Sequence, residues 1–496
     1  MKNKNFILAI DQGTTGTKAL IVDHNLSVIA QAYEEFPQHF PSPGSVEHKP
    51  DEIWTSVEKT IKKVTQKIDK KKISSIGITN QRETICFWNK KTLKPLANAI
   101  VWQDRRTTPL CQELKSKGLE KHFQEKTGLL IDPYFSGTKV AWALENWGDV
   151  KNANKNGSLA VGTIDSYLIS KLSQGASHVT EPSNASRTLC YHLTHHQWDE
   201  ELCRTLKINP AIWPEVRPST GKFASTYGLK FLPDGIPITG VLGDQQSALL
   251  GQACTEEGTA KCTYGTGSFI LLNTGNKPVL SRHRLLTTIA WALNEKDYTY
   301  ALEGSAFIAG AAVQWLRDGL KIIKKSSDIE KLAEKVETSE GVTFVPALTG
   351  LGAPHWDPHA RGLISGITRG TTSSHIARAV LEGIAFQNAD ILAAMQKDLK
   401  NKIIQLNVDG GASNNKLLMQ FQADILDTPL IRPKMTETTV LGSVFAAGIG
   451  VGLWKDLNEI KKVWKKDIEF KPKFSPEERK KYLSQWNIAV EQSKQH

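Results

Sequence analysis

The chain has 496 residues, of which 40% are hydrophobic and 23% charged, so it is long enough for two or more globular domains. Lysine and arginine outnumber aspartate and glutamate by 62 to 51, which gives a net charge of +11. The lysines are spread over stretches that read as helix surfaces, and no nucleic-acid-binding motif accompanies them. This diffuse charge favours anionic metabolites, and we expect no nucleic-acid partner.

Cysteine spacing and hydropathy indicate the compartment. The six cysteines lie far apart and include no CxxC pair, which is typical of free thiols in a reducing compartment. Asp11 interrupts the first apolar run, so we expect no secretory signal peptide. No uncharged apolar run approaches ~20 residues, so we expect no membrane span. A cytoplasmic location follows as an expectation.

Strand-like and helix-like stretches alternate along the chain, which predicts an α/β fold. In chain order, we expect strands over residues 6–10, 19–22 and 73–79, and helices over 51–67 and 375–397. We also expect a helical, charged tail over 472–496 on the surface.

The turn between the first two strands, "DQGTTGTK" (11–18), crowds glycines and threonines between apolar runs. It fails the Walker A pattern, and a strand rather than a helix follows it. Two interpretations stay open: a hairpin tip whose N–H groups and hydroxyls meet phosphates, or a plain turn. In the first interpretation Asp11, at the strand end, holds Mg²⁺ through water.

A second strand, Gly/Thr turn and strand occur about half a chain later, at "YGTGSF" around Thr266. The recurrence predicts two related domains, 1–252 and 253–496, with a cleft between them. Two such tips facing one cleft suit the phosphates of a nucleotide, so the second tip favours the phosphate interpretation of the first.

Polar side chains follow two apolar strands of the first half. In "TNQRET", Arg82 and Glu83 offer forked donors and acceptors for a small molecule with several hydroxyls, although a solvent-exposed ion pair is an equal alternative. Trp102, in "VWQDRRT", offers an apolar wall. In "GDQQSA", Asp244 is the candidate general base for a hydroxyl attacking a phosphoryl group, with Gln245 beside it. The alternative makes Asp244 the N-cap of a helix beginning at Gln245.

The second half carries three further candidates. "EGSAFIAGAAVQWL" (303–316) reads as one helix, with Gly310 and Gln314 on a shared face that admits a flat base or merely permits close helix packing. "NVDGGASNN" reads as a strand and a Gly-rich turn before a helix, and it places Gly411 and Asn415 near a nucleotide. The loop "APHWDPHARG" lacks a third soft ligand, so a metal site there is not expected.

Taken in order, these segments resemble the FGGY carbohydrate kinase family nearly from end to end. The combination of "NQRET", "WQDRRT" and "GDQQ" is similar to the branch of that family that acts on glycerol. The phosphate segments "DQGTTGTK", "YGTGSF" and "DGGASNN" resemble those of other family members as well.

This resemblance implies a fold of two actin-like (ribonuclease-H-like) ATPase domains that close over ATP and Mg²⁺. It implies phosphorylation of glycerol to sn-glycerol 3-phosphate with release of ADP, in a cytosolic homodimer or homotetramer. By motif, the residues implied to contact glycerol are Arg82, Glu83, Trp102, Tyr134, Asp244 and Gln245, with Asp244 as the base. Those implied to contact the nucleotide are Thr14, Thr15, Gly16, Lys18, Thr266, Gly310, Gln314, Gly411 and Asn415, with Thr14 also at the product phosphate.

The chain departs from the family pattern in three places. The usual DQGTTSSR carries Gly16 and Lys18 here, which removes a hydroxyl and the forked guanidinium. Residues 221–240 lack the loop that binds fructose 1,6-bisphosphate and the chain lacks the phosphorylatable histidine, so neither regulation is expected. His355 and His359 stand where tyrosine is frequent. Two alternatives remain: a kinase for another small polyol or ketose, and a nucleotide-dependent switch of the actin or Hsp70 type.

Overall fold

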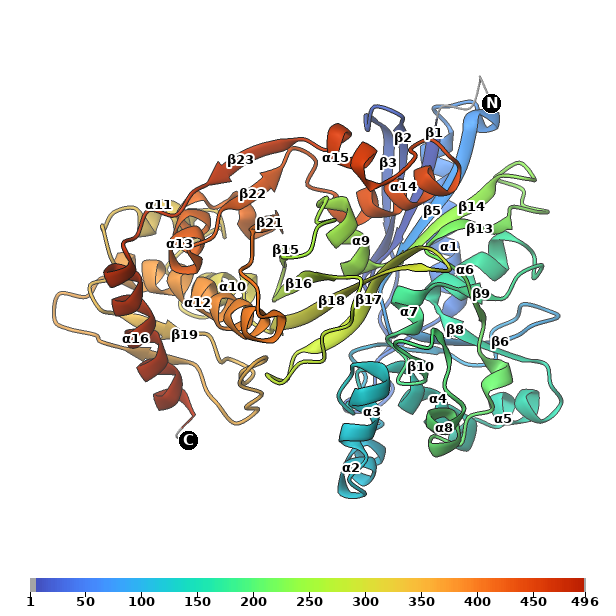
Figure 1. Ribbon diagram of the computed structural model, residues 1–496, viewed down its shortest axis with the longest axis horizontal. Helices are drawn as coiled ribbons and strands as arrows, with labels where there is room; N and C mark the ends of the chain where they lie inside the picture. Colours follow the sequence, from blue (N-terminus) through green and yellow to red (C-terminus); the bar gives the residue numbers. More distant parts are fainter. Residues whose placement is uncertain (1–5, 495–496) are drawn as a thin grey trace.

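The computed structural model describes residues 6–494. The molecule is elongated and contains two large β-sheets, one from the first half of the chain and one from the second (Figure 1). Helices lie on both faces of these sheets, so the chain has the α/β fold that the alternation of elements predicts.

The first sheet has the strand order β13-β14-β5-β1-β2-β3. Its strands are β1 (Phe6–Gln12), β2 (Gly16–Asp23), β3 (Val28–Glu35), β5 (Ile73–Asn80), β13 (Thr220–Ser225) and β14 (Pro237–Gly243). Strand β1 reads as a continuous apolar run because helices bury both of its faces: Leu8 and Ile10 join one core, and Ile7 and Ala9 join another.

The second sheet has the strand order β17-β18-β16-β15-β21-β22-β23. Its strands are β15 (Thr259–Tyr264), β16 (Ser268–Gly275), β17 (Leu286–Asn294), β18 (Asp297–Ala306), β21 (Gln405–Gly410), β22 (Leu430–Pro433) and β23 (Lys466–Phe470).

The two sheets repeat one pattern of pairing. In the first, β1 is antiparallel to β2 and parallel to β5, β5 is parallel to β14, and β13 adds an antiparallel edge. In the second, β15 is antiparallel to β16 and parallel to β21, β21 is parallel to β22, and β23 adds the antiparallel edge. The chain therefore contains two related units, as the recurring hairpins predict. The division at residues 252 and 253 stays a prediction.

Two pairs of helices enclose the first sheet. Helices α1 (Pro50–Thr65) and α6 (Ile164–Leu172) pack on one face, and α9 (Asp244–Gly251) and α14 (Thr438–Gly450) lie on the other side. Helix α14 comes from the C-terminal part of the chain, yet it lies across β14, β5 and β1 (Figure 1). Its approach to α9 requires glycine, because a Cβ on Gly442 would lie 1.8 Å from the Ser247 carbonyl oxygen.

A shared core joins the two units. Ala9 and Leu242 of the first sheet belong to the same buried cluster as Val444 of α14 and as Leu271 and Trp291 of the second sheet. The two sheets are therefore held around one apolar layer that contains α9 and α14.

The remaining helices divide between the second sheet and a smaller lobe. Around the second sheet are α10 (Gly310–Asp318), α11 (Asp328–Ala333), α12 (Ser373–Leu399), α13 (Lys416–Leu426) and α16 (Pro476–Ser493), whereas α15 (Leu457–Val463) packs into the shared core beside α14. The smaller lobe has α2 (Thr108–Ser116), α3 (Glu120–Thr127), α4 (Ser136–Asn146), α5 (Gly148–Lys155) and α8 (Glu200–Thr205), whereas α7 (Pro182–Ala185) lies against β17 and β14 of the two large sheets.

Short strands complete the architecture. A four-stranded sheet in the smaller lobe contains β4 (Glu47–His48), β7 (Ala99–Ile100), β6 (Ile85–Asn89) and β8 (Leu159–Thr163). Three two-stranded pairs are β9 (Val179–Thr180) with β12 (Glu215–Val216), β10 (Tyr191–His192) with β11 (Gln197–Trp198), and β19 (Thr343–Val345) with β20 (Leu363–Ser365).

Most of the expected elements are confirmed, with one correction. The predicted helix over residues 303–316 is wrong in its first part. Glu303 and Ser305 pair with β16 inside strand β18, and the helix begins only at Gly310. Pairing with a neighbouring strand overrides the local pattern of small residues, which suits a strand or a helix equally.

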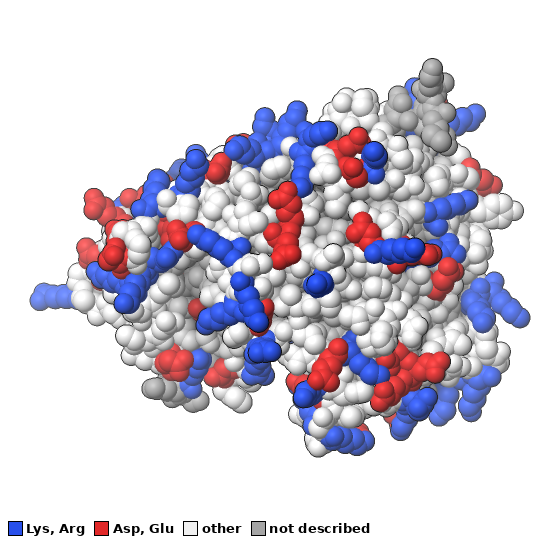
Figure 2. Space-filling model, viewed as in Figure 1, with Lys and Arg blue, Asp and Glu red and all other residues white. Residues whose placement is uncertain are grey.

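The surface charge is diffuse, as expected. Figure 2 shows lysine and arginine mixed with acidic residues over the visible face, with basic side chains more frequent along its upper edge over β23 and α15. No helix within residues 6–494 combines the length and the hydropathy that crossing a membrane demands.

Candidate active site

Each of the two Gly/Thr tips is closed by a backbone hydrogen bond between glycines, over four residues at the first tip and over three at the second. At the β1–β2 tip, the Gly13 N–H donates to the Gly16 carbonyl over 2.9 Å, and at the β15–β16 tip, the Gly265 N–H donates to the Gly267 carbonyl over 2.8 Å. The second tip also accepts a hydrogen bond of 3.0 Å from the Gly310 N–H, at the start of α10. Each tip thus presents backbone and hydroxyl groups at the end of its central hairpin.

A pocket of about 430 Å³ lies beside the second tip, and we name it the glycine pocket. Its lining contains all five nucleotide residues predicted in the second half: Thr266, Gly310, Gln314, Gly411 and Asn415. Apolar walls come from Val313, Ile329, Leu381 and Leu418. The cavity therefore combines glycine backbone with an apolar interior, which suits a flat base.

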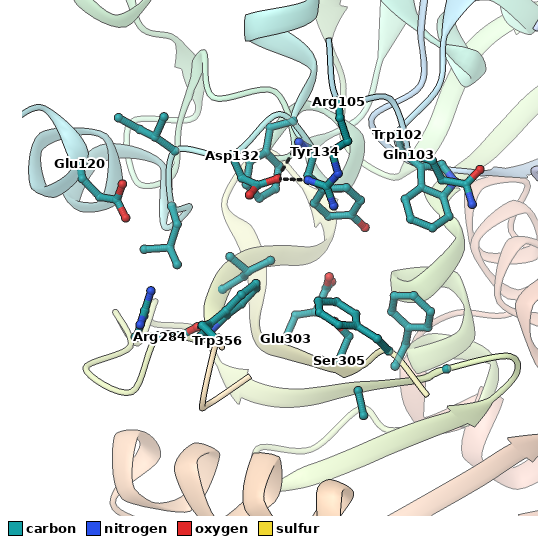
Figure 3. A pocket seen from close by; sticks show the side chains of 18 of the residues that line it. Trp102, Gln103, Arg105, Glu120, Asp132, Tyr134, Arg284, Glu303, Ser305 and Trp356 are labelled. Carbon is teal, nitrogen blue, oxygen red and sulfur yellow. Dashed lines mark hydrogen bonds and ion pairs between the residues drawn. The ribbon is translucent and has the colours of Figure 1, made fainter. Parts of the chain in front are cut away.

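A second pocket, of about 480 Å³, opens between the two halves of the chain, and we name it the aromatic pocket. Trp102 and Tyr134 stand on one side of it, with ring centroids 5.7 Å apart in an edge-to-face arrangement. Figure 3 shows them facing Glu303, Ser305 and Trp356 across the cavity. Residues from both halves thus line one cavity, as the predicted cleft requires.

A buried network of charged side chains lies next to the aromatic pocket. Glu303, which lines the pocket, accepts hydrogen bonds from Arg82 Nη1 over 2.5 Å and Nη2 over 3.1 Å, and from Arg187 Nη2 over 3.0 Å. Arg187 Nε donates to Glu83 over 2.6 Å. Arg82 Nε lies 3.1 Å from Asp244 Oδ1. The network therefore links the pocket to the candidate base.

This network excludes the solvent-exposed ion pair that the sequence left open for Arg82 and Glu83. Their side chains are 2% and 1% exposed, and the closest approach of Arg82 Nε to Glu83 Oε1 is 3.9 Å. Glu83 has a φ of 60°, which turns its side chain away from Arg82 toward Arg187. The guanidinium of Arg187 lies over the Tyr134 ring, 5.6 Å from its centroid.

Asp244 is the first residue of α9, and Gly243 is the N-cap residue. The predicted alternative, in which Asp244 caps a helix beginning at Gln245, is therefore wrong. Asp244 Oδ1 accepts a hydrogen bond of 2.6 Å from the Gln245 N–H, and its side chain is 29% exposed. The Gln245 side-chain carbonyl accepts a hydrogen bond from Lys261 Nζ. Both residues thus follow the end of β14, with Asp244 beside Arg82 and Gln245 beside Lys261.

Burial sets the electrostatics of this site. It raises the pKa of the Asp244 carboxyl above its ordinary value, against the opposing effect of Arg82 and Lys261. Burial alone would also raise the pKa of Glu303, but Arg187 and Arg82 outweigh it and hold that pKa at about 2. Glu303 is thus firmly ionised, whereas Asp244 is the more basic carboxylate, a combination expected of a general base beside a structural acid.

The first tip contributes a hydroxyl to the aromatic side of the site. The indole N–H of Trp102 donates to Thr14 Oγ1 over 2.9 Å, which joins the tip to the aromatic pocket. Lys18 lines neither of the two pockets. It forms an ion pair of 2.6 Å with Glu437, the residue just before α14.

Asp11 lies on β1 beside the first tip. Burial, together with repulsion from Asp244, raises the pKa of its carboxyl to about 7. Within residues 6–494 no group of three or more His, Cys, Asp or Glu side chains is placed to hold a metal. Two neighbouring carboxylates nevertheless suit Mg²⁺, which proteins usually hold through one or two carboxylates while water and phosphate supply the other ligands. His355 is instead bound to Asp390 over 2.9 Å.

Three residues of the candidate site are not predicted by the sequence. Arg187 and Glu303 complete the charge network, and Phe269 lines the aromatic pocket beside Trp102. One feature of the sequence points to Arg187: it is the single charged residue in the stretch 182–191. The helix predicted over residues 303–316 places Glu303 on the wrong element, so the sequence does not predict its contact with Arg82.

Comparisons with known proteins agree with this geometry. The family model described as the FGGY family of carbohydrate kinases, N-terminal domain, matches residues 6–251, and the C-terminal domain model matches residues 260–451. A protein of Bdellovibrio bacteriovorus named "Glycerol kinase" is 54% identical over 98% of this chain and 99% of its own length. A protein of Myxococcus xanthus with the same name is 52% identical over 99% and 100%.

Solved structures show the same likeness. The glycerol kinase of Plasmodium falciparum, solved with ADP, superposes with a TM-score of 0.95 at 41% identity, covering 99% of this chain and 98% of that one. A ligand-bound xylulose kinase from Lactobacillus acidophilus gives a TM-score of 0.87 at 26% identity, covering 98% and 97%. The two family models together span most of the chain, in the order in which its two sheets occur. The chain therefore belongs to the FGGY family of carbohydrate kinases.

Proposed function

We propose that this chain transfers the γ-phosphoryl group of ATP to a terminal hydroxyl of glycerol, giving sn-glycerol 3-phosphate and ADP, the first step of glycerol catabolism. The observation that carries the proposal is the likeness, over nearly the whole chain, to relatives named for this activity. The buried Arg–Glu–Asp network beside an aromatic cavity supports it, because it offers both donors and acceptors to a small polyol.

We assign the general base to Asp244. Its carboxylate takes the proton from the attacking hydroxyl as oxygen bonds to the γ-phosphorus and the bond to the leaving ADP breaks in line. The raised pKa of Asp244 makes it a stronger base than an ordinary aspartate, and its 29% exposure leaves it open to a substrate in the cleft. Arg82 fixes the carboxylate from the other side.

We assign the polyol contacts to Arg82, Glu83, Trp102, Tyr134, Asp244 and Gln245. Trp102 and Tyr134 offer ring surface to the carbon backbone, while the charged groups receive the hydroxyls. Domain closure over this cavity excludes water, which would otherwise compete with glycerol as the acceptor.

We assign the nucleotide to the glycine pocket and the two tips. Thr266, Gly310, Gln314, Gly411 and Asn415 hold the nucleoside side, and Thr14, Thr15, Gly16 and Lys18 the phosphate side, with Thr14 also at the product phosphate. Mg²⁺ bound with the nucleotide supplies charge neutralisation at the phosphates. Asp11 is the residue proposed to hold it, through water.

The remaining expectations belong to the same proposal. We propose two domains, 1–252 and 253–496, a cytoplasmic location, a homodimer or homotetramer, and no nucleic-acid partner. The diffuse surface charge supports the last of these.

The test is an assay of ADP release, coupled to NADH oxidation, across glycerol, dihydroxyacetone, xylulose, ribulose and gluconate. We expect the highest kcat/KM with glycerol. A higher value with a ketose would make the chain a sugar kinase of the same family. ATP hydrolysis unaffected by any acceptor would favour the nucleotide-dependent switch.

A further inference from the structure

The first hairpin tip has a neighbour that the assigned residues do not include. Tyr33 lies on the edge strand β3, in register with Lys18 of β2. It therefore shares a face of the sheet with Gly16, two residues before Lys18, and sits diagonally across from it. Its side chain is exposed, as an edge position allows.

Gly16 leaves the space that the Tyr33 ring occupies. A Cβ built on Gly16 would lie 2.6 Å from both the Cζ and the hydroxyl oxygen of Tyr33. Gly16 is an ordinary strand residue without a positive φ, so its backbone does not require glycine. Instead, because Gly16 has no side chain, the phenol end of Tyr33 lies directly over the tip.

The hydroxyl of Tyr33 therefore lies at the tip itself. It lies 3.3 Å from the Thr15 hydroxyl, next to Thr14, which accepts from the Trp102 indole at the wall of the aromatic pocket. The arrangement adds one more donor to the groups that the tip presents.

We propose that Tyr33 is a nucleotide-contact residue of this chain, whose phenolic hydroxyl donates a hydrogen bond to a phosphate oxygen of the bound nucleotide at the β1–β2 tip. The inference rests on the proposed function, because it takes the nucleotide phosphates to lie at this tip. It assigns a role to the pair Gly16 and Tyr33 together: the glycine makes room and the tyrosine supplies the hydroxyl.

The test is ADP binding by titration calorimetry with Tyr33→Phe, which removes only the hydroxyl. We expect binding to weaken about 10- to 150-fold, the usual effect of losing one hydrogen bond to a charged group. The KM for ATP should rise by a similar factor, and the KM for glycerol should stay within about twofold. Tyr227→Phe is the matched control, since Tyr227 is also exposed but follows β13 on the opposite edge of the sheet.

A second variant tests the pairing. Gly16→Ala forces the Tyr33 ring aside, so it should weaken ADP binding by itself, and the double variant with Tyr33→Phe should be little worse than either single one. Unchanged ADP affinity in Tyr33→Phe, with normal binding by the unaltered protein, would overturn the inference and leave the proposed function standing. Absence of ADP binding by the unaltered protein would overturn both.

Discussion

Replacing Glu303 by glutamine perturbs the charge network at the point where the two halves of the chain meet. Glu303 lies on β18 of the second sheet, and its partners Arg82 and Arg187 come from the first half. The substitution keeps the shape of the side chain. It removes one negative charge and presents an amide N–H₂ to a guanidinium that previously met an oxygen.

The structure gives the size of the effect. Glu303 accepts three hydrogen bonds of 2.5, 3.1 and 3.0 Å from two arginines, and all three side chains are at most 3% exposed. Breaking such a buried pair leaves a charge uncompensated and typically costs about 3–5 kcal/mol. We therefore expect the free energy of unfolding to fall by about that amount. The pKa of Asp244 should fall as well, because Glu303 helps to raise it.

Two measurements separate the catalytic consequence from the structural one. Urea unfolding reports stability, and the acid limb of kcat against pH reports the base. The limb should move to lower pH in Glu303→Gln. The control is Glu382→Gln, which breaks the 3.0 Å ion pair between Arg378 and an equally buried glutamate on α12, and it should lose stability without moving the limb. A limb that moves equally in both variants, or in neither, would refute the reasoning.

Stability should also depend on pH through Glu303. The folded-state pKa of about 2 lies below the ordinary value of 4.5. The ionised group therefore stabilises the fold above about pH 4.5, and the contribution is lost as pH falls toward about 2. Glu303→Gln should lack this part of the acid dependence. An identical fall in stability between these pH values in the two proteins would contradict the assignment.

Three further substitutions test other parts of the site and fold. Asp244→Asn should lower kcat by ~10²–10⁴ while glycerol still binds, as measured by steady-state kinetics and calorimetry, and near-normal turnover would remove Asp244 from the role of base. Arg82→Ala should chiefly raise the KM for glycerol, and an unchanged KM would count against the polyol site. Gly442→Ala should destabilise the protein by about 3 kcal/mol or more in urea unfolding, because its Cβ meets the Ser247 carbonyl, whereas an unaffected midpoint would mean that α14 shifts freely.

The sequence predicted the parts of the fold that depend on local patterns. The β1–β2 hairpin, β5, α1 and α12 follow from apolar periodicity, and the two related units follow from the recurrence of one Gly/Thr turn. The pocket residues Thr266, Gly310, Gln314, Gly411 and Asn415 were brought together as expected. The resemblance to the FGGY family supplied this set, because the local pattern around Gly310 and Gln314 suits helix packing as well as a nucleotide.

The sequence does not predict contacts between side chains that lie far apart along the chain. Nothing near Glu303 indicates that it meets Arg82 and Arg187, which lie 221 and 116 residues away. The partner of Lys18 is Glu437, from the other end of the chain. The role of Gly16 becomes clear only when β3 is paired with β2. In the sequence, a glycine in a turn motif indicates an unusual backbone conformation, whereas in the structure the Tyr33 ring occupies the place of a side chain.

The position of α14 has a consequence for how the protein is made. Residues 438–450 complete the buried face of a sheet whose strands all lie before residue 244. During synthesis, the apolar side chains of Ile7, Ala9, Leu20 and Val22 therefore lack their cover from α14 until nearly the entire chain has left the ribosome. The first unit to be synthesised is therefore completed only by a helix from the C-terminal part of the chain, so a chaperone that shields this face during translation would act on the first sheet.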